Sequence, residues 1–253
     1  MSVLRHILPA VVSALVFLGC WESYVALTET SPLVLPAPSD VLNGLRVERA
    51  ALARHAAATI GVAGIGFSLS VLFAVLVSVA LHFAGWLRRG MMPLLVASQT
   101  VPIVALAPLM VLWFGFGLLP KVLLVILVTF FPMVVSLMAG YATLPRAFRD
   151  QLVSMGAGRW QVFRLAALPS ARGHFFAGLR ISATYAIVAT IFAEYAGARR
   201  GLGIYILTAK NNFRADLVLS AVVISALLTL TLLALIHLID RVTGRRHRRA
   251  THA

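Results

Sequence analysis

The chain has 253 residues, of which 60% are hydrophobic and only 12% are charged, and its mean hydropathy is +0.94. A soluble domain of this length needs much more polar surface, so the composition excludes a soluble globular protein and predicts an all-α, polytopic bundle of membrane helices. The net charge of +14 does not indicate a nucleic-acid-binding protein, because the basic residues, all but two of them Arg, are interspersed between apolar runs, as membrane topology requires.

Six apolar segments are long enough to cross a bilayer, which takes about 20 apolar residues. They are Ile7–Leu27, Ala56–Phe83, Met91–Phe114, Val122–Tyr141, Phe175–Ala196 and Leu217–Ile239. The first is apolar to its end, which favours an uncleaved span over a lipoprotein signal that ends before Cys20. The third contains Pro102 and Pro108, which lack backbone N–H donors, and we expect both to kink it.

The connectors between these spans differ in length and charge. After the first span, a turn-rich stretch leads to a short polar helix, for which Ser39 is the predicted N-cap. A short turn at Gly85–Gly90 carries two arginines. The longest connector, residues 142–174, is basic and amphipathic. Within it, Pro145 suits the first turn of a helix and Gly156 suits its end.

The distribution of Lys and Arg predicts that both termini lie in the cytoplasm. In this orientation 14 of the 22 basic residues lie inside and eight outside. The inner bases have only Asp150 and Asp240 as counter-charges, whereas four acidic residues offset the outer bases. Because cytoplasmic loops carry an excess of Lys and Arg, we expect a multi-pass protein of the cytoplasmic (inner) membrane whose segment 143–173 is cytoplasmic.

Small residues recur at four-residue steps along the second and fifth spans. They are Gly66, Ser70, Ala74 and Ser78 in the second span, and Gly178, Ser182, Ala186 and Thr190 in the fifth, where Glu194 takes the next step. Such stripes let helix backbones approach closely in lipid. Helix packing accounts for every one of these residues except Glu194.

Several kinds of site are missing from the sequence. Neither lysine follows a Gly and precedes a Ser or Thr, so the chain has no phosphate-binding loop for ATP. No helical His pair at i, i+4 with an adjacent Glu occurs, and one cysteine cannot form an intrachain disulfide or a Cys cluster. We therefore predict no catalytic residue, metal site or cofactor, and a membrane-embedded enzyme is disfavoured.

An apolar strip marks the predicted helix that begins near Pro145. Phe148, Leu152 and Met155 stand at i, i+4 and i+7 among basic residues. Such a strip on a cytoplasmic loop is typical of a membrane-surface helix or of a helix that docks in the groove of a partner.

The same loop resembles the cytoplasmic motif of the permease subunits of ATP-binding-cassette importers. That motif is Glu-Ala-Ala, three residues, Gly, nine residues, Ile, one residue, Leu-Pro. Asp150 matches the acid, Gly156 the glycine and Leu168-Pro169 the closing pair, all at the family spacing. The sequence departs from the motif at the two alanines and the isoleucine, where it has Gln151, Leu152 and Ala166.

Further segments, in the same order and spacing, are similar to the nitrate, sulfonate, taurine and bicarbonate branch of this family. They are Trp21-Glu22 with Leu35-Pro36-Ala37-Pro38-Ser39, then Pro102, Ala107-Pro108-Leu109, Trp113-Phe114-Gly115 and Gly117, and finally Gly178-Leu179-Arg180, Ala193-Glu194 and Gly201-Leu202-Gly203. The resemblance thus covers nearly the whole chain and implies one transmembrane permease domain over residues 1–253.

The resemblance also implies partners and a coupling site. Two separate ATP-binding cassette subunits, an extracytoplasmic solute-binding protein and a second permease copy are expected, in contact with membrane lipid and without nucleic acid. The loop 143–173 would be the coupling loop, whose short helix inserts into the ATPase. The residues placed there are Asp150, Leu152, Met155, Gly156, Leu168 and Pro169.

The sequence favours one class of solute but leaves alternatives open. Residues 98–102 and 130–132 look more like permeases for pyrimidine thiamine precursors or riboflavin, so a small vitamin-precursor heterocycle is favoured. The alternatives are import of nitrate, sulfonate, taurine or bicarbonate by the same machinery, and a secondary transporter without an ATPase. Candidate pathway residues are Ser98, Gln99, Thr100 and Glu194. The first three could equally serve helix packing, and Glu194 could instead pair with Arg199, Arg200 or Lys121.

Overall fold

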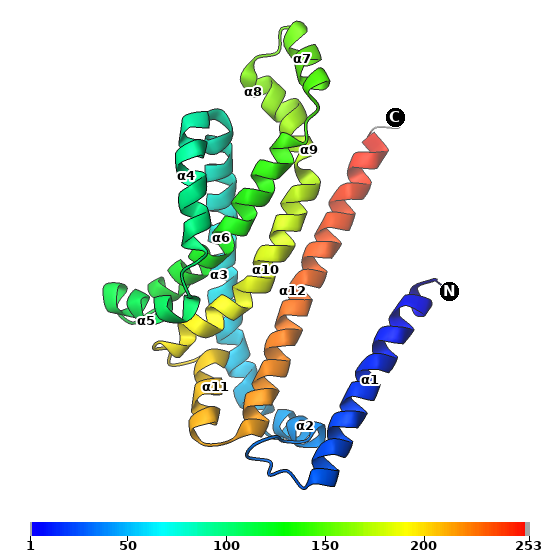
Figure 1. The fold of residues 1–253 in the computed structure, drawn as a ribbon, viewed down its shortest axis with the longest axis vertical. Coiled ribbons are helices and arrows are strands. Elements are labelled where there is room, and N and C mark those ends of the chain that lie inside the picture. Colours follow the sequence, from blue (N-terminus) through cyan, green and yellow to red (C-terminus); the bar gives the residue numbers. More distant parts are fainter. Residues whose placement is uncertain (1, 251–253) are drawn as a thin grey trace.

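The computed structural model describes residues 2–250, and their side chains at positions 8–9 and 11–244. Positions 1 and 251–253 of the predicted domain 1–253 therefore lie outside the described residues. Within them the chain is a bundle of helices with no strand (Figure 1). The elements are α1 Ser2–Thr28, α2 Pro38–Val47, α3 Arg49–Phe83, α4 Gly85–Ser98, α5 Ile103–Phe114, α6 Leu119–Ala142, α7 Arg146–Ser154, α8 Arg159–Val162, the π-helix η1 Phe163–Ala167, α9 Leu168–Ser170, α10 Arg172–Tyr195, α11 Leu202–Asn211 and α12 Ala215–Ala250.

The helices confirm the all-α membrane bundle. Five of them, α1, α3, α6, α10 and α12, are long and apolar enough to cross a bilayer, and they coincide with five of the predicted spans. The third predicted span is broken instead: α4 and α5 are bent by 102°. Of the two expected kinks, only that at Pro102 coincides with the break, because α5 continues through Pro108. The predicted turn at Gly85–Gly90 is wrong, since α4 already begins there and the chain reverses at Ala84.

Helix α6 forms the centre of the bundle, with α3 and α10 packed against it. Both small-residue stripes face this helix. A Cβ built on Gly66 of α3 would lie 2.7 Å from Cβ of Val125, and one on Gly178 of α10 would lie 2.7 Å from Cβ of Ser136. Both contacts are too close for any larger residue. The glycines therefore let α6 approach two neighbours at once, which explains stripes on helices that do not pair mainly with each other.

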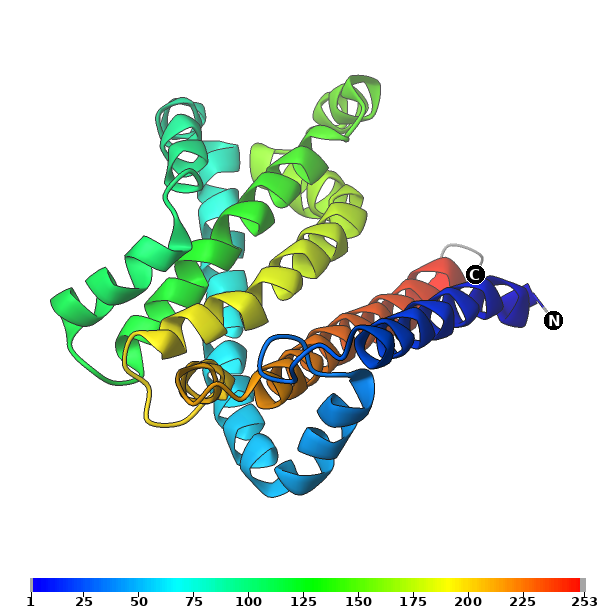
Figure 2. The same ribbon diagram turned by 60° about the horizontal axis from the view of Figure 1, so that its bottom comes forward.

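Helix α1 stands apart from this bundle and packs mainly on α2 (Figures 1 and 2). The Glu22 carboxylate accepts hydrogen bonds from the Ser39 amide (3.1 Å) and hydroxyl (2.7 Å), which ties α1 to the start of α2. The predicted Ser39 cap is wrong. Because Pro38 takes the first helical position, Ala37 becomes the N-cap, and its N–H donates to the carboxylate of Asp40.

Candidate functional site

A cavity of about 840 Å³ opens where α4 and α5 meet at their break, against α6 and α10. Ser98, Gln99 and Thr100 line it from the break, Phe131 from α6 and Tyr185 from α10. The structure thus brings three of the four candidate pathway residues to one cavity. Its remaining walls are mostly apolar, as in many sites for small molecules.

Local chemistry at the break explains how these polar residues reach the cavity. Pro102 has no N–H to continue a helix and restricts the residue before it to extended backbone, so α4 ends at Ser98 and α5 starts after Pro102. The Ser98 hydroxyl donates to the Leu95 carbonyl (2.7 Å), and the Thr100 hydroxyl donates to the Ala97 carbonyl (2.8 Å). The Ala97 carbonyl also accepts a bond from the Thr100 amide (3.1 Å), so both hydroxyls add hydrogen bonds to carbonyls in the last turn of α4.

Glu194, the fourth candidate, lies elsewhere. It is 0% exposed near the end of α10 and is not among the residues that line the cavity. The Gly203 amide donates to its Oε2 (2.7 Å), and the Thr59 hydroxyl of α3 lies 2.9 Å from Oε1 and donates to the carboxylate. The Leu202 amide in turn donates to the Thr59 hydroxyl (2.8 Å). Among the residues described, no ion pair is formed by Glu194.

Two glycines allow this carboxylate to be enclosed. A Cβ on Gly201 would overlap the Glu194 carboxyl group, and one on Gly203 would lie 2.7 Å from the Glu194 Cβ. Gly201 also has φ +140°, and both its carbonyl oxygen (2.8 Å) and its amide nitrogen (3.2 Å) lie within hydrogen-bond distance of Nδ1 of His55. The Glu194 cluster (Glu194, Thr59, His55, Gly201 and Gly203) therefore joins α3, α10 and the start of α11.

Sequence reasoning did not identify Thr59 or His55 as part of this cluster. Thr59 is 135 residues from Glu194 in sequence, and His55 is 146 residues from Gly201. The available signal was the Gly-Leu-Gly run shortly after a glutamate. Tyr205 packs its ring 5.1 Å from that of His55, and burial, with the nearby Glu48 carboxylate, raises the pKa of this tyrosine.

The predicted coupling loop projects beyond the ends of α6 and α10, with α7 farthest from the bundle (Figure 1). Gly156 follows α7 with φ +86°, so the predicted stop is confirmed, whereas Pro145 is the N-cap just before the first turn in which it was predicted. Phe148 and Met155 are 49% and 76% exposed, and no residue of α7 is buried. An apolar strip exposed on a projecting helix is suited to a protein partner or a membrane surface.

The other motif residues lie on the same loop. Asp150 is exposed on α7, Leu152 is partly exposed beside Phe148, and Leu168 and Pro169 are exposed in α9, which leads into α10. The structure therefore places the motif on one continuous segment, although its acid and its closing pair lie on different helices.

Aromatic side chains pack the predicted coupling loop against the bundle. The ring of Phe163 in η1 lies 5.2 Å from those of Phe83 and Tyr141, and 4.9 Å from that of His82. The Arg159 guanidinium donates to the Phe83 carbonyl (3.2 Å). Because Phe83 ends α3 and Tyr141 lies in the last turn of α6, these contacts connect the loop to both helices.

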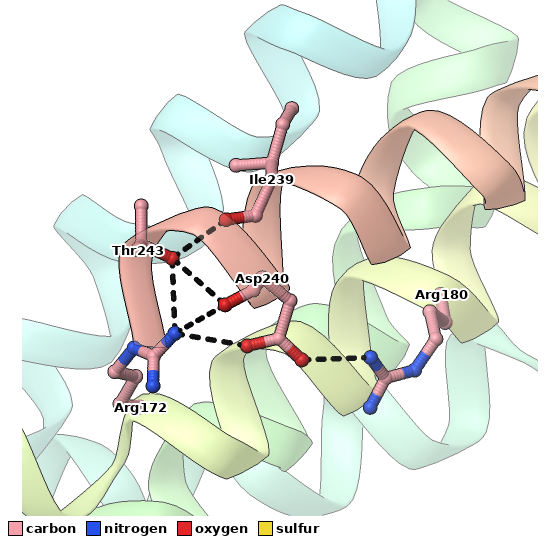
Figure 3. Close-up of polar contacts among 5 residues, drawn as sticks. All are labelled: Arg172, Arg180, Ile239, Asp240 and Thr243. Carbon is pink, nitrogen blue, oxygen red and sulfur yellow. Dashed lines mark hydrogen bonds and ion pairs between the residues drawn. The ribbon is translucent and has the colours of Figure 1, made fainter. Parts of the chain in front are cut away.

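A second polar cluster joins α10 to α12 (Figure 3). The Asp240 carboxylate pairs with Arg172 at 3.0 Å through one oxygen and with Arg180 at 3.2 Å through the other. Arg172 also donates to the Thr243 hydroxyl (2.9 Å). These side chains are 30–39% exposed, so we expect the ion pairs to add little stability.

No group of three or more His, Cys, Asp or Glu side chains that could hold a metal ion is found in the part of the chain that the structure describes.

Comparison with known proteins adds independent information. Residues 66–249 match the family model described as binding-protein-dependent transport system inner membrane component. The formylaminopyrimidine transport permease protein ThiX of Halalkalibacterium halodurans is 34% identical over 198 residues, covering 78% of this chain and 79% of the relative. The riboflavin transport system permease protein RibX of Chloroflexus aurantiacus is 34% identical over 236 residues, covering 92% and 88%. The taurine transport system permease protein TauC of Escherichia coli is 31% identical over 235 residues, covering 90% and 86%.

Proposed function

The chain belongs to the binding-protein-dependent transport system inner membrane components, and on this premise we propose that it forms the solute pathway of an importer driven by a separate ATPase. Membership makes it a multi-pass inner-membrane permease subunit of the ATP-binding-cassette type, one that works with an ATPase and a solute-binding protein. The observation that carries the proposal beyond the family is the exposed apolar strip on α7, a helix with no buried residue.

The coupling proposal assigns α7 to the ATPase. Phe148, Leu152 and Met155 would enter a groove of that subunit, Asp150 and Gly156 would fix the helix and its exit, and Leu168 and Pro169 would lead the motion into α10. The ring contacts of Phe163 with α3 and α6 support this route, because they leave the loop few ways to move independently.

The first prediction tests this docking. Phe148→Asp should reduce recovery of the ATPase with the affinity-purified permease by at least tenfold, because it places a charge in the apolar contact. The matched control is Phe213→Asp, which makes the same change at a side chain that is 74% exposed near the opposite end of the bundle. Equal ATPase recovery from wild type and Phe148→Asp would remove α7 from the interface.

The second proposal concerns orientation: both termini and the loop 143–173 lie in the cytoplasm. The excess of Arg on that side supports this orientation. So does the arrangement of the helices, because the N-terminal end of α1 and the C-terminal end of α12 point to the same side as α7 (Figure 1).

Cysteine labelling tests this orientation. With Cys20 replaced by Ser, a cysteine at the exposed Thr208 should react with an impermeant thiol reagent added to intact cells. A cysteine at the exposed Gly158 should react only after the membrane has been opened. The reverse pattern would contradict both the orientation and the coupling role.

The pathway and the solute complete the proposal. The cavity, with Ser98, Gln99 and Thr100, would face a second copy of the permease across the pathway, and Glu194 would hold the outer end of that pathway through α11. The exposed apolar surface of α1 supports pairing with a second copy or lipid.

As the solute we favour a small vitamin-precursor heterocycle, such as a hydroxymethylpyrimidine thiamine precursor or riboflavin, since ThiX and RibX are among the relatives. The TauC relative supports a sulfonate as the second candidate.

A further inference from the structure

The cavity at the α4–α5 break contains no full charge. Among the described residues that line it, none is Lys, Arg, Asp or Glu, and the only titratable side chains are His174 and Tyr185. If the cavity lies at the twofold axis of a dimer, the second copy adds the same residue types, because the symmetry repeats the residues at the axis. A sulfonate or nitrate would therefore lose its water here without gaining a Lys or Arg partner, which is unfavourable.

The polar side chains of the cavity differ in what they can still bind. The hydroxyls of Ser98, Thr100 and Ser136 already donate to backbone carbonyls at 2.7, 2.8 and 2.6 Å. Gln99 is exposed, and its one hydrogen bond within the described residues is long, 3.5 Å from Nε2 to the Ser98 hydroxyl. Its carbonyl oxygen and the rest of its NH2 group therefore remain available as an acceptor and a donor on one plane.

The walls around Gln99 suit an aromatic ligand. Phe131, Tyr185 and the prolines at 102 and 132 line the same cavity, and Tyr185 is 49% exposed. Flat rings gain from apolar burial and from contact with aromatic side chains. A glutamine amide forms two parallel hydrogen bonds with a ring edge that carries a ring nitrogen beside an amino group, as it does with adenine.

We propose that this cavity recognises an uncharged planar nitrogen heterocycle, and that Gln99 is the residue that specifies its donor–acceptor edge. This inference rests on the proposed function, because it assumes that the cavity lies on the solute pathway. It adds to the proposed function the residue that discriminates between solutes, Gln99. It also adds a physical reason for the rejection of oxyanions, which is that no Lys or Arg lines the cavity.

Ligand binding to the full-length permease in lipid nanodiscs tests the inference. The probes are 4-amino-5-hydroxymethyl-2-methylpyrimidine, riboflavin and ethanesulfonate, each titrated to millimolar concentration. Wild type should bind at least one heterocycle ten times more tightly than ethanesulfonate. Gln99→Leu should weaken heterocycle binding roughly tenfold or more, the cost of losing a two-bond amide contact. Gln99→Arg should raise the affinity for ethanesulfonate, because it supplies the missing cation.

The control is Asn211→Leu, which removes an exposed amide from α11 and should leave binding unchanged. The inference is overturned if ethanesulfonate binds as tightly as the heterocycles, if no heterocycle binds, or if Gln99→Leu binds like wild type. Recovery of the ATPase with the permease from the same membranes distinguishes failure of this inference from failure of the proposed function. A permease that recovers its ATPase but shows no heterocycle preference refutes only the inference.

Discussion

Gly201→Ala is expected to abolish most of the folded permease. A Cβ at this position would overlap the Glu194 carboxyl group, which is fully buried and has no solvent to move into. The backbone at φ +140° and ψ 160° lies in a region used almost only by Gly, which adds strain of about 1–3 kcal/mol for a residue with a side chain. Overpacking of the cluster adds roughly 1–3 kcal/mol. We expect a melting temperature in detergent lower by 10 °C or more, with a matching loss of monodisperse protein.

The matched control is Gly117→Ala. Gly117 has nearly the same φ, +144°, but a Cβ there would meet no atom within 4 Å. It therefore measures the backbone strain without the clash, and it should lower the melting temperature by only a few degrees. If the two variants have the same melting temperature, the enclosure of Glu194 by Gly201 does not matter for folding. The double variant Gly201→Ala with Glu194→Ala should recover part of the loss, since it removes the overlapping carboxyl group.

Gly156→Val is expected to abolish coupling while leaving the fold intact. Gly156 has φ +86°, a conformation that costs a branched residue about 1–2 kcal/mol, so the chain would leave α7 in another direction. No residue of α7 is buried in the bundle, so little else holds the helix in place. Solute-stimulated ATP hydrolysis and uptake should both fall by at least tenfold, with an unchanged melting temperature.

Gly158→Val is the control for this variant. Gly158 lies two residues further along the same loop with φ −72° and ψ 165°, which any residue can adopt, and its Cβ would be 3.8 Å from the nearest atom. It should keep hydrolysis and uptake within twofold of wild type. Full coupling in Gly156→Val would show that the geometry of the α7 exit is irrelevant to transport.

Features with a strong local cause were predictable from the sequence. Apolar length alone identified five helices that can span the bilayer, because a span depends on consecutive residues. The end of α7 at Gly156 was predictable for the same reason: a helix that stops at a glycine needs no distant contact.

Features that depend on competing signals were predicted only in part. Pro102 and Pro108 both lack an N–H, yet only Pro102 coincides with the break, since α5 tolerates Pro108 within its length. Ser39 is a good capping residue and would start the helix at residue 40, but Pro38 starts it two residues earlier, and the Ser39 hydroxyl donates to Glu22 instead. Such outcomes depend on the neighbours, which residue type alone does not specify.

The surroundings of Glu194 could not be predicted from the sequence. The basic residues near it in sequence suggested an ion pair, whereas the structure satisfies the carboxylate with the Gly203 amide and the Thr59 hydroxyl. Thr59 reaches it because α3 packs directly against α10 and α11 in the assembled bundle (Figure 1). Pairings between distant segments arise from the assembled bundle, and no local pattern near Thr59 signals them.

The most direct test of the whole account is uptake into proteoliposomes that contain the permease with or without its ATPase. With the solute-binding protein and a radiolabelled solute outside, and ATP with the ATPase on the α7 side, the account predicts accumulation that requires all of these components and is lost in Gly156→Val. Accumulation at the wild-type rate without the ATPase, driven by an ion gradient alone, would contradict it and identify a secondary transporter.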